Sequence, residues 1–283
     1  MFAKSMLPAT GCLMSFALLA SVSTMLIVGS LPRLAVSALA LELSAKDWLI
    51  AALIFAAAII SSTIGFAFSA FAGAMLFHIE PSPARAVEIM ILASIGIQVT
   101  SLGLLWRGID WRLSMPYVVG GLGALPLGLY ALMHLDPRAY ISGLGALLLV
   151  YGAIMLARPA KWIASDGPLS RMLVGSLGGI TGPLAAFPAA FVGIWCGVRG
   201  FDKLVTRSII QPYILVMQLA VLSALTATGN APAALSFSAL IFVLPGVLGA
   251  CIGMRIFRQM SDARYQRLVV VGLIASGAAL LLK

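Results

Sequence analysis

The stretch LVGSLGGITGPLAAFPAAFVGIWCGVRGFDKLVTRSIIQPYILVMQ, from Leu173 to Gln218, decides the fold class of this chain. It consists of an apolar segment interrupted by glycine and proline, a short charged loop, and a helix that carries polar side chains. Interrupted apolar helices are typical of solute sites in membranes, where the freed backbone groups line a cavity. The stretch therefore predicts a membrane protein that handles a solute.

The composition of the whole chain also indicates that the protein lies in a membrane. Hydrophobic residues make up 61% of the 283 residues and charged residues 10%, which is too little polar surface to coat a water-soluble globule. The formal net charge of +9 is spread over loops in small groups. Membrane orientation accounts for such a distribution, so we expect the lipid bilayer and no nucleic acid as a partner.

Apolar runs of roughly membrane-spanning length recur along the chain and predict an all-α polytopic fold with about eight transmembrane segments. The predicted segments are 48–78, 84–106, 113–135, 138–157, 172–198, 204–225, 235–257 and 268–282. The first would be about 46 Å long as one helix, against a hydrocarbon core of about 30 Å, so we expect a break near Gly65 or Gly73. The N-terminal extension, 1–47, contains an apolar run at 12–30 that is an extra membrane helix, a signal-like segment or the product of an upstream start codon.

An internal repeat divides the core into two halves. The stretch GLGALPLGLYALMHLDPRAY at 121–140 resembles PGVLGACIGMRIFRQMSDARY at 245–265, and SAFAGAM at 69–75 stands opposite AAFPAAF at 185–191. The paired residues are Gly121 with Gly246, Gly128 with Gly253, Asp136 with Asp262, Arg138 with Arg264, and Arg85 with Arg207. We expect a first repeat at 48–157, a polar linker at 158–171 and a second repeat at 172–283. Chance similarity among Gly/Leu/Ala-rich helices is the alternative, and the sequence leaves parallel and inverted repeats open.

Polar side chains follow one face of the predicted helix 204–225. Gln211 and Gln218 lie four and eleven residues after Arg207, which places all three within an arc of roughly 40°. Because a charge at the bilayer centre costs at least ~2.5 kcal/mol, this stripe should face the protein interior. A guanidinium and amide N–H groups suit the oxygens of a small anion. In the alternative, Arg207 marks the membrane surface and the glutamines join helices.

Two further groups of residues are candidates for the site. The sequence GGITGP at 178–183 predicts a broken helix in which Thr181 and Gly182 contact an anion, although such glycines also serve close helix packing. In the first half, Arg85 is followed one turn later by Glu88, the one acidic residue inside a predicted span. This pair is a candidate for gating or coupling, unless Glu88 merely neutralises Arg85 or another cation.

These residues resemble the sulfite exporter TauE/SafE family, also called the toluenesulfonate uptake permease family, over about 48–282. The most specific stretches are GGITGPLAAFPAAFVGIWCGVRGFDK and RSIIQPYILVMQ. The first half departs from the commoner pattern, because AFSAFAGAM has Gly73 alone where a glycine triplet is usual. The resemblance implies a multi-pass secondary carrier in the bacterial cytoplasmic membrane that moves small sulfur-containing anions such as sulfite, sulfonates or sulfoacetate.

Other function classes fit the sequence less well. Intramembrane proteolysis needs a serine with a histidine, an HExxH pair or two membrane aspartates, and none is evident, so we expect no enzyme. The three cysteines and two histidines lack zinc spacing, so neither a metal nor another cofactor is expected. A structural or accessory membrane subunit is the main alternative. Direction of transport, coupling ion and oligomeric state are left open.

Loop charges give conflicting signals about orientation. A cytoplasmic side is favoured for a group of basic residues in the second half, because the opposite loop TATGNAPAAL carries no charge. This group is Arg199, Lys203, Arg207, Arg255, Arg258, Arg264 and Arg267. With eight full crossings, the linker residues Arg158, Lys161 and Arg171 would favour the opposite orientation.

Overall fold

The computed structural model describes residues 43–66, 68–134, 167–185, 188–227 and 237–281, together with helical positions at 142–143, 145–146, 148–150 and 152–153. All regular structure in these residues is helical. The N-terminal apolar run at 12–30 lies outside the described residues, as do Asp136 and Arg138 of the predicted repeat. The all-α prediction is confirmed for the part of the chain that the structure describes.

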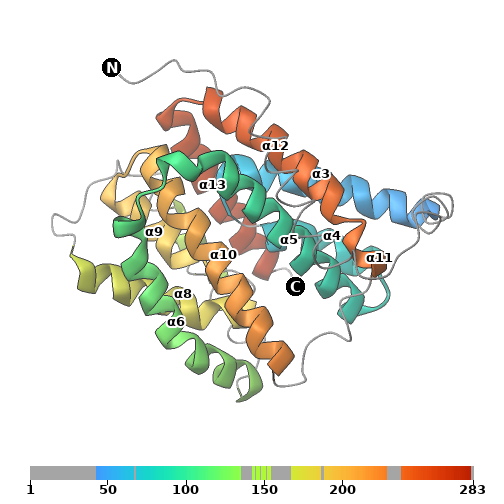
Figure 1. Ribbon diagram of the computed structural model, residues 1–283, viewed down its shortest axis with the longest axis horizontal. Helices are drawn as coiled ribbons and strands as arrows, with labels where there is room; N and C mark the ends of the chain where they lie inside the picture. Colours follow the sequence, from blue (N-terminus) through green and yellow to red (C-terminus); the bar gives the residue numbers. More distant parts are fainter. Residues whose placement is uncertain are drawn as a thin grey trace.

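The described helices are arranged as a bundle (Figure 1). They are α3 (Ala45–Ile64), α4 (Phe68–Ile79), α5 (Pro83–Leu105), the short helix η1 (Trp106–Gly108), α6 (Trp111–His134), α8 (Pro168–Ala185), α9 (Ala190–Arg199), α10 (Lys203–Ala227), α11 (Phe237–Leu240), α12 (Val243–Gln259) and α13 (Asp262–Leu281). Among described residues, four stretches are long and apolar enough to cross a bilayer alone: Ala45–Ile64, Glu88–Gly108, Trp111–Ala131 and Lys203–Ala224. This number is smaller than the eight predicted segments, partly because the segments 172–198 and 235–257 are each split into shorter helices.

The first predicted segment is a helical hairpin rather than a single crossing. Helix α3 ends at Gly65, whose φ of 112° is a conformation that glycine adopts readily and other residues do not. Helix α4 then turns back, so that the Glu80 carboxylate directly after it lies 3.0 Å from the Lys46 ammonium in the first turn of α3. The break predicted near Gly65 is confirmed, whereas Gly73 lies inside α4.

The second-half segment is also broken, but later than GGITGP predicts. Helix α8 continues through 178–183 to Ala185, and α9 begins at Ala190. The Thr181 hydroxyl donates to the Gly178 carbonyl at 3.2 Å, within the helix. The glycines serve close packing instead, because a Cβ at Gly175 or Gly179 would overlap backbone carbonyls of α6. The expected break at 178–183 is therefore wrong, and the interruption falls between α8 and α9.

One end of the bundle, here called the Lys46 end, collects the start of α3, the end of α4 and the start of α5. Besides the contact between Lys46 and Glu80, the Arg85 guanidinium near the start of α5 lies 4.0 Å from the Asp47 carboxylate of α3. Helices α3 and α5 therefore both run away from this end.

The opposite end, the Lys203 end, collects the start of α10 and the ends of α5 and α12. The Lys203 ammonium donates to the Arg258 carbonyl at 3.4 Å, and the Arg258 guanidinium donates to the Leu104 carbonyl of α5 at 2.7 Å. The start of α13 lies here too, since the Lys203 amide donates to the Asp262 carboxylate at 3.4 Å. Helix α12 thus runs parallel to α3 and α5, while α10 and α13 run in the opposite direction.

The largest helix interfaces join α6 to α8 and α3 to α12, and each pair is parallel. Gly120 and Gly128 of α6 face Met172 and Ile180 of α8 in the same order along both helices. In Figure 1, α3, α5 and α12 run from the right-hand side towards the left, and α6, α8 and α10 run the other way. The described part of the chain thus contains two helical hairpins, α3–α4 and α8–α9, which enter from opposite ends.

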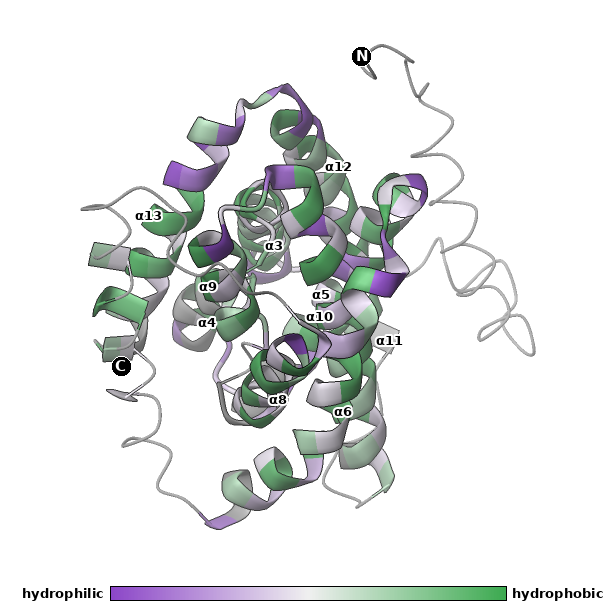
Figure 2. Ribbon diagram, turned by 90° about the vertical axis from the view of Figure 1, so that its left-hand side faces the viewer, coloured by the Kyte–Doolittle hydropathy of each residue, from purple (hydrophilic) through white to green (hydrophobic). Residues whose placement is uncertain are grey.

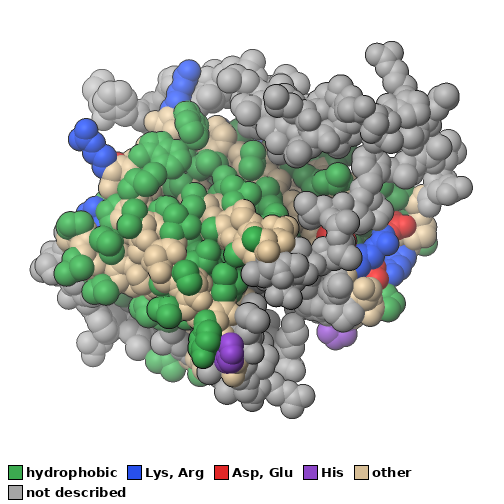
Figure 3. All heavy atoms as spheres, turned by 60° about the horizontal axis from the view of Figure 1, so that its bottom comes forward, with side chains coloured by type: hydrophobic (Ala, Val, Ile, Leu, Met, Phe, Trp, Pro, Cys, Tyr) green, Lys and Arg blue, Asp and Glu red, His purple; other side chains and the backbone are tan. Residues whose placement is uncertain are grey.

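The outer surface suits a bilayer. Figure 2 shows helices such as α6 and α8 as mostly hydrophobic, with hydrophilic residues near the connection between α12 and α13. Leu127 of α6 and Leu173 of α8 are more than half exposed. A broad apolar face with charged side chains at its margins is visible in Figure 3. Exposed leucines on such a face contact lipid rather than water.

The parallel packing of α6 on α8 should depend on glycine at the points of closest approach. A Cβ at Gly120 would overlap the Met172 carbonyl, whereas a Cβ at Gly123 on the same helix meets no atom within 4 Å. We expect Gly120→Ala to lower the free energy of unfolding by roughly 1–3 kcal/mol through overpacking. Gly123→Ala is the matched control and should be neutral or stabilising by up to about 1 kcal/mol. Thermal unfolding in detergent measures both, and equal midpoints would contradict this packing.

Candidate functional site

A buried arginine lies at the tip of the first hairpin. Arg207 belongs to the second turn of α10, a helix that starts where the Asp202 carboxylate accepts from the amides of Leu204 and Val205 at 2.9 and 2.8 Å. The Arg207 side chain has no solvent exposure. Its Nη2 donates to the Ser62 carbonyl in the last turn of α3.

The broken helix explains why a cation is stable there. The last carbonyls of α3 have no partner within the helix, and they form the negative end of the helix dipole. Arg207 and Gln211 supply donors, since the Gln211 amide nitrogen donates to the Gly65 carbonyl at 3.0 Å. A Cβ at position 65 would lie 3.0 Å from the Arg207 Nε, so glycine is required by space as well as by φ. The Arg207 guanidinium also lies 4.5 Å from the centroid of the Phe257 ring.

The predicted polar stripe faces the protein interior. Arg207 and Gln211 are almost completely buried, and the Gln218 amide nitrogen donates to the Ser94 hydroxyl of α5 at 2.6 Å. The burial of Arg207 favours a role inside the protein over a role as an orientation signal at the surface. Within the described residues, Nε and Nη1 of Arg207 and the side-chain oxygens of Gln211 and Gln218 make no hydrogen bond of normal geometry, although the Tyr265 hydroxyl lies beside the guanidinium. The stripe therefore keeps donors and acceptors that a solute can use.

The second hairpin approaches the first through α9 rather than through Thr181. A Cβ at Gly193 of α9 would lie 3.9 Å from both Phe66 and Ile210, so α9 lies beside the tip of the α3–α4 hairpin. The Thr181 hydroxyl is used within α8, and a Cβ at Gly182 would lie 3.3 Å from the Cβ of Pro188. Among the described residues, no hydrogen bond joins Thr181 to the Arg207 group. A binding role for Thr181 and Gly182 stays a prediction.

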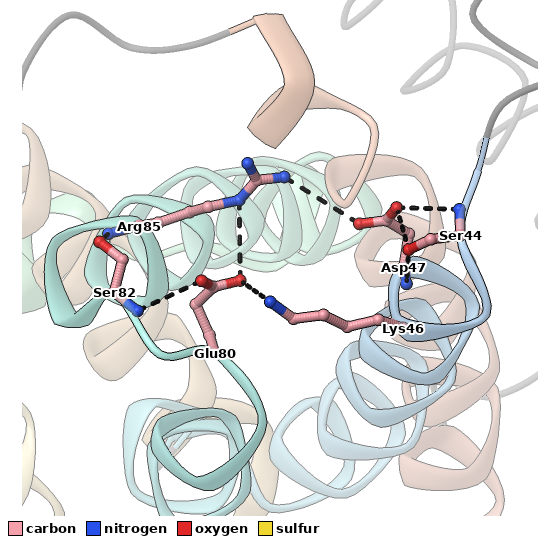
Figure 4. A network of polar contacts seen from close by, with 6 residues as sticks. All are labelled: Ser44, Lys46, Asp47, Glu80, Ser82 and Arg85. Carbon is pink, nitrogen blue, oxygen red and sulfur yellow. Dashed lines mark hydrogen bonds and ion pairs between the residues drawn. The ribbon is translucent and has the colours of Figure 1, made fainter.

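The ion pairs of Arg85 lead to residues that the sequence did not single out. Its guanidinium lies 3.7 Å from Glu80 and 4.0 Å from Asp47, and Glu80 also contacts Lys46, as Figure 4 shows. These partners come from α3 and the α4–α5 connection, which approach one another through the hairpin fold. Glu88 is buried in α5. The role of Arg85 and Glu88 as a gating or coupling pair stays a prediction.

The charges of this network control the protonation of Glu80. Burial alone would raise the pKa of the Glu80 carboxyl. The hydrogen bond from Lys46, a backbone hydrogen bond from Ser82 and the positive charges of Lys46 and Arg85 outweigh burial, so the pKa of Glu80 lies below its usual value. The network therefore favours an ionised Glu80 at the Lys46 end.

Sequence reasoning missed two groups beside the stripe on α10, Phe257 at Arg207 and Ser94 at Gln218. Phe257, which comes from α12, and Ser94, which comes from α5, carry no motif, so only the fold brings them to α10. The charge of Lys203 is visible in the sequence as an orientation signal, but in the structure this side chain stabilises the end of a helix. Its ammonium donates to the carbonyls of Phe257, at 3.3 Å, and Met260, and so caps the end of α12.

No metal centre is visible in the described part of the chain, where no three His, Cys, Asp or Glu side chains are placed to hold a metal ion. Comparison with known families gives a match to the model described as sulfite exporter TauE/SafE, over residues 49–280. No curated protein and no solved structure matches the chain.

The Glu80 network should stabilise the protein in a pH-dependent way. Because the folded-state pKa is lowered, its contribution is present above the unfolded pKa of about 4.3 and is lost as pH falls through the folded pKa. We expect Glu80→Gln to cost roughly 1–2 kcal/mol at neutral pH, since a charge-assisted hydrogen bond is removed. The cost should shrink on acidification. Thermal unfolding midpoints of wild type, Glu80→Gln, Lys46→Met and the double variant measure the coupling, and additive losses would contradict the pairing.

Proposed function

We propose that this chain, which belongs to the sulfite exporter TauE/SafE family, is a secondary carrier of small sulfur-containing anions such as sulfite, sulfonates or sulfoacetate. The family match and the apolar helices make it a multi-pass membrane transporter. The location of the protein in the bacterial cytoplasmic membrane and the identity of its substrate are part of the proposal.

The buried guanidinium of Arg207 carries this proposal. It lies at the tip of a broken helix, with two of its nitrogens free of hydrogen-bond partners among the described residues. A guanidinium in such a place suits a small oxyanion, because a charged donor in a low-dielectric environment binds strongly. We assign Arg207 the role of binding the charge of the anion, and Gln211 a hydrogen bond to it. Gln218, about 16 Å further along α10, would bind the anion at a second position on its path. A contact of the anion with Thr181 and Gly182 is also part of this proposal.

The halves at 48–157 and 172–283, joined by the linker 158–171, support alternating access in this proposal. The reciprocal packing of α3 on α12 and of α6 on α8 is the arrangement expected of inverted repeats. In such carriers one bundle moves relative to the other around a central site. Arg85 and Glu88 near the Lys46 end, opposite the Lys203 end, are then placed for gating or coupling.

An accessory subunit without transport activity is the second candidate. It is favoured by one observation, the bonds that Arg207 and Gln211 make to the protein's own carbonyls. Family membership favours transport instead. Flux measurements separate these two functions.

The basic residues predict which end faces the cytoplasm. Arg171, Lys203 and Arg267 all lie at the Lys203 end, because α8, α10 and α13 begin there. By the positive-inside rule we propose that this end is cytoplasmic. A cysteine in place of the exposed Arg267 should react with an impermeant maleimide only after cells are permeabilised. A cysteine in place of the exposed His78, after the turn back of α4, should react in intact cells, and the reverse pattern would overturn the orientation.

Transport should depend on the Arg207 stripe. We expect labelled sulfite or a sulfonate to enter proteoliposomes containing the wild type. Arg207→Ala and Gln218→Ala should each lower the flux about ten- to hundredfold, the range that corresponds to a lost hydrogen bond to a charged group. Arg264→Ala, at an exposed position of α13, is the matched control and should retain flux.

Amounts of inserted protein are matched, and thermal stability of each variant is measured alongside. Wild-type flux that persists in both Arg207→Ala and Gln218→Ala would make the stripe structural. Absence of flux for every anion in the wild type would instead favour the accessory function.

A further inference from the structure

Helix α5 carries a second row of buried polar side chains that no motif indicates. Ser94, Gln98 and Ser101 are at least nine-tenths buried, although α5 is an apolar membrane-spanning helix. At about 100° per residue, their spacing places them within an arc of about 60°. Like the stripe on α10, this row consists of polar side chains that face the protein interior.

One contact fixes how the two rows face each other. The hydrogen bond of 2.6 Å between Gln218 and Ser94 joins α10 to α5, and the two helices are antiparallel. Seven residues along each helix, about 10 Å at 1.5 Å per residue, Gln211 comes level with Ser101. Gln98 lies between these two levels. We call the six residues Ser94, Gln98, Ser101, Arg207, Gln211 and Gln218 the polar seam.

The polar seam contains hydrogen-bond acceptors for which the described residues supply no donors. The side-chain oxygens of Gln98, Gln211 and Gln218 and the hydroxyl of Ser101 have no partner among the described residues. For Gln211 the orientation of the amide is fixed, because the Gly65 carbonyl accepts and only the amide nitrogen can donate to it. Its oxygen therefore stays free for a donor from outside the protein. Buried unpaired oxygens are costly in a bilayer, so the polar seam requires an occupant that donates.

The free donors of Arg207 lie at one end of the same seam. Its Nε and Nη1 offer a positive charge, whereas the glutamine oxygens further along offer lone pairs. A fully deprotonated oxyanion such as sulfite satisfies the arginine but repels the amide oxygens. An anion that carries its own hydroxyl or other donor satisfies both.

Resting on the proposed function, we propose that the polar seam selects small sulfur oxyanions that carry a hydrogen-bond donor, such as hydrogensulfite or a hydroxyalkanesulfonate. The anionic oxygens bind Arg207. The donor binds the oxygen of Gln211, with Ser101 at the same level, and binds the oxygen of Gln98 when the anion moves about 5 Å along the seam. Gln98 and Ser101 are therefore specificity-determining residues on α5, opposite the stripe on α10.

Selectivity between two anions of equal size tests this proposal. Hydroxyethanesulfonate and propanesulfonate differ by a hydroxyl in place of a methyl group, and a site that bonds the hydroxyl discriminates against the analogue without it. In proteoliposomes of the full chain we expect the wild type to transport hydroxyethanesulfonate at least about tenfold faster. Sulfite uptake should rise as the external pH falls and hydrogensulfite replaces sulfite, with the pH gradient collapsed by an ionophore.

Substitutions on α5 connect the preference to the polar seam. Gln98→Leu and the smaller change Ser101→Ala should each reduce the ratio of the two sulfonate fluxes, and together bring it close to one. Gln259→Leu, at an exposed position at the end of α12, is the control and should keep the wild-type ratio. Because a ratio within one preparation is compared, incomplete insertion of a variant does not alter the result.

Failure of the proposed function and failure of the polar-seam proposal give different results. If the wild type transports neither sulfonate nor sulfite at any pH, the proposed function itself is wrong. If it transports both sulfonates at equal rates, or keeps its preference after both α5 substitutions, the carrier stands and the polar seam does not select for a donor. A seam filled by structural water alone gives this second result.

Discussion

The structure depends on the contact between the Arg207 guanidinium and the carbonyl groups at the end of α3. A helix that stops inside a membrane protein leaves carbonyls without partners, and water is scarce there to satisfy them. Arg207 and Gln211 provide these partners, and Phe257 covers the guanidinium from α12. Gly65 permits the turn at this point because it adopts a positive φ and leaves space for the arginine. One interaction thus stabilises the hairpin tip and holds a buried charge inside the protein.

The hairpins also decide the direction of every later helix. Because α3 and α4 enter and leave at the Lys46 end, α5 starts there, whereas α8 and α10 start at the opposite end and run in the opposite sense. With these helix directions, the loop charges no longer give conflicting signals about the orientation in the membrane. Arg171 begins α8 at the same end as Lys203 and Arg267, so these three basic residues favour one orientation. A count of eight full crossings had placed Arg171 on the opposite side.

The charged loop between α9 and α10 fixes the positions of the helices beside it. Asp202 starts α10 and Lys203 caps α12, so the loop positions the two helices that carry Arg207 and Phe257. The polar groups that remain free lie deeper, between α5 and α10.

The sequence by itself determined the membrane environment, the helical class, the interruption near Gly65 and the inward face of Arg207 and Gln211, because composition and helical spacing are local properties. Only the tertiary structure decided that α4 turns back, that α8 continues through 178–183, and that Arg85 pairs with Glu80 and Asp47. A glycine- and proline-rich run breaks a helix or packs it closely, and its neighbours determine which. Contacts such as Phe257 with Arg207, and Ser94 with Gln218, join residues far apart in the chain, so no local pattern predicts them.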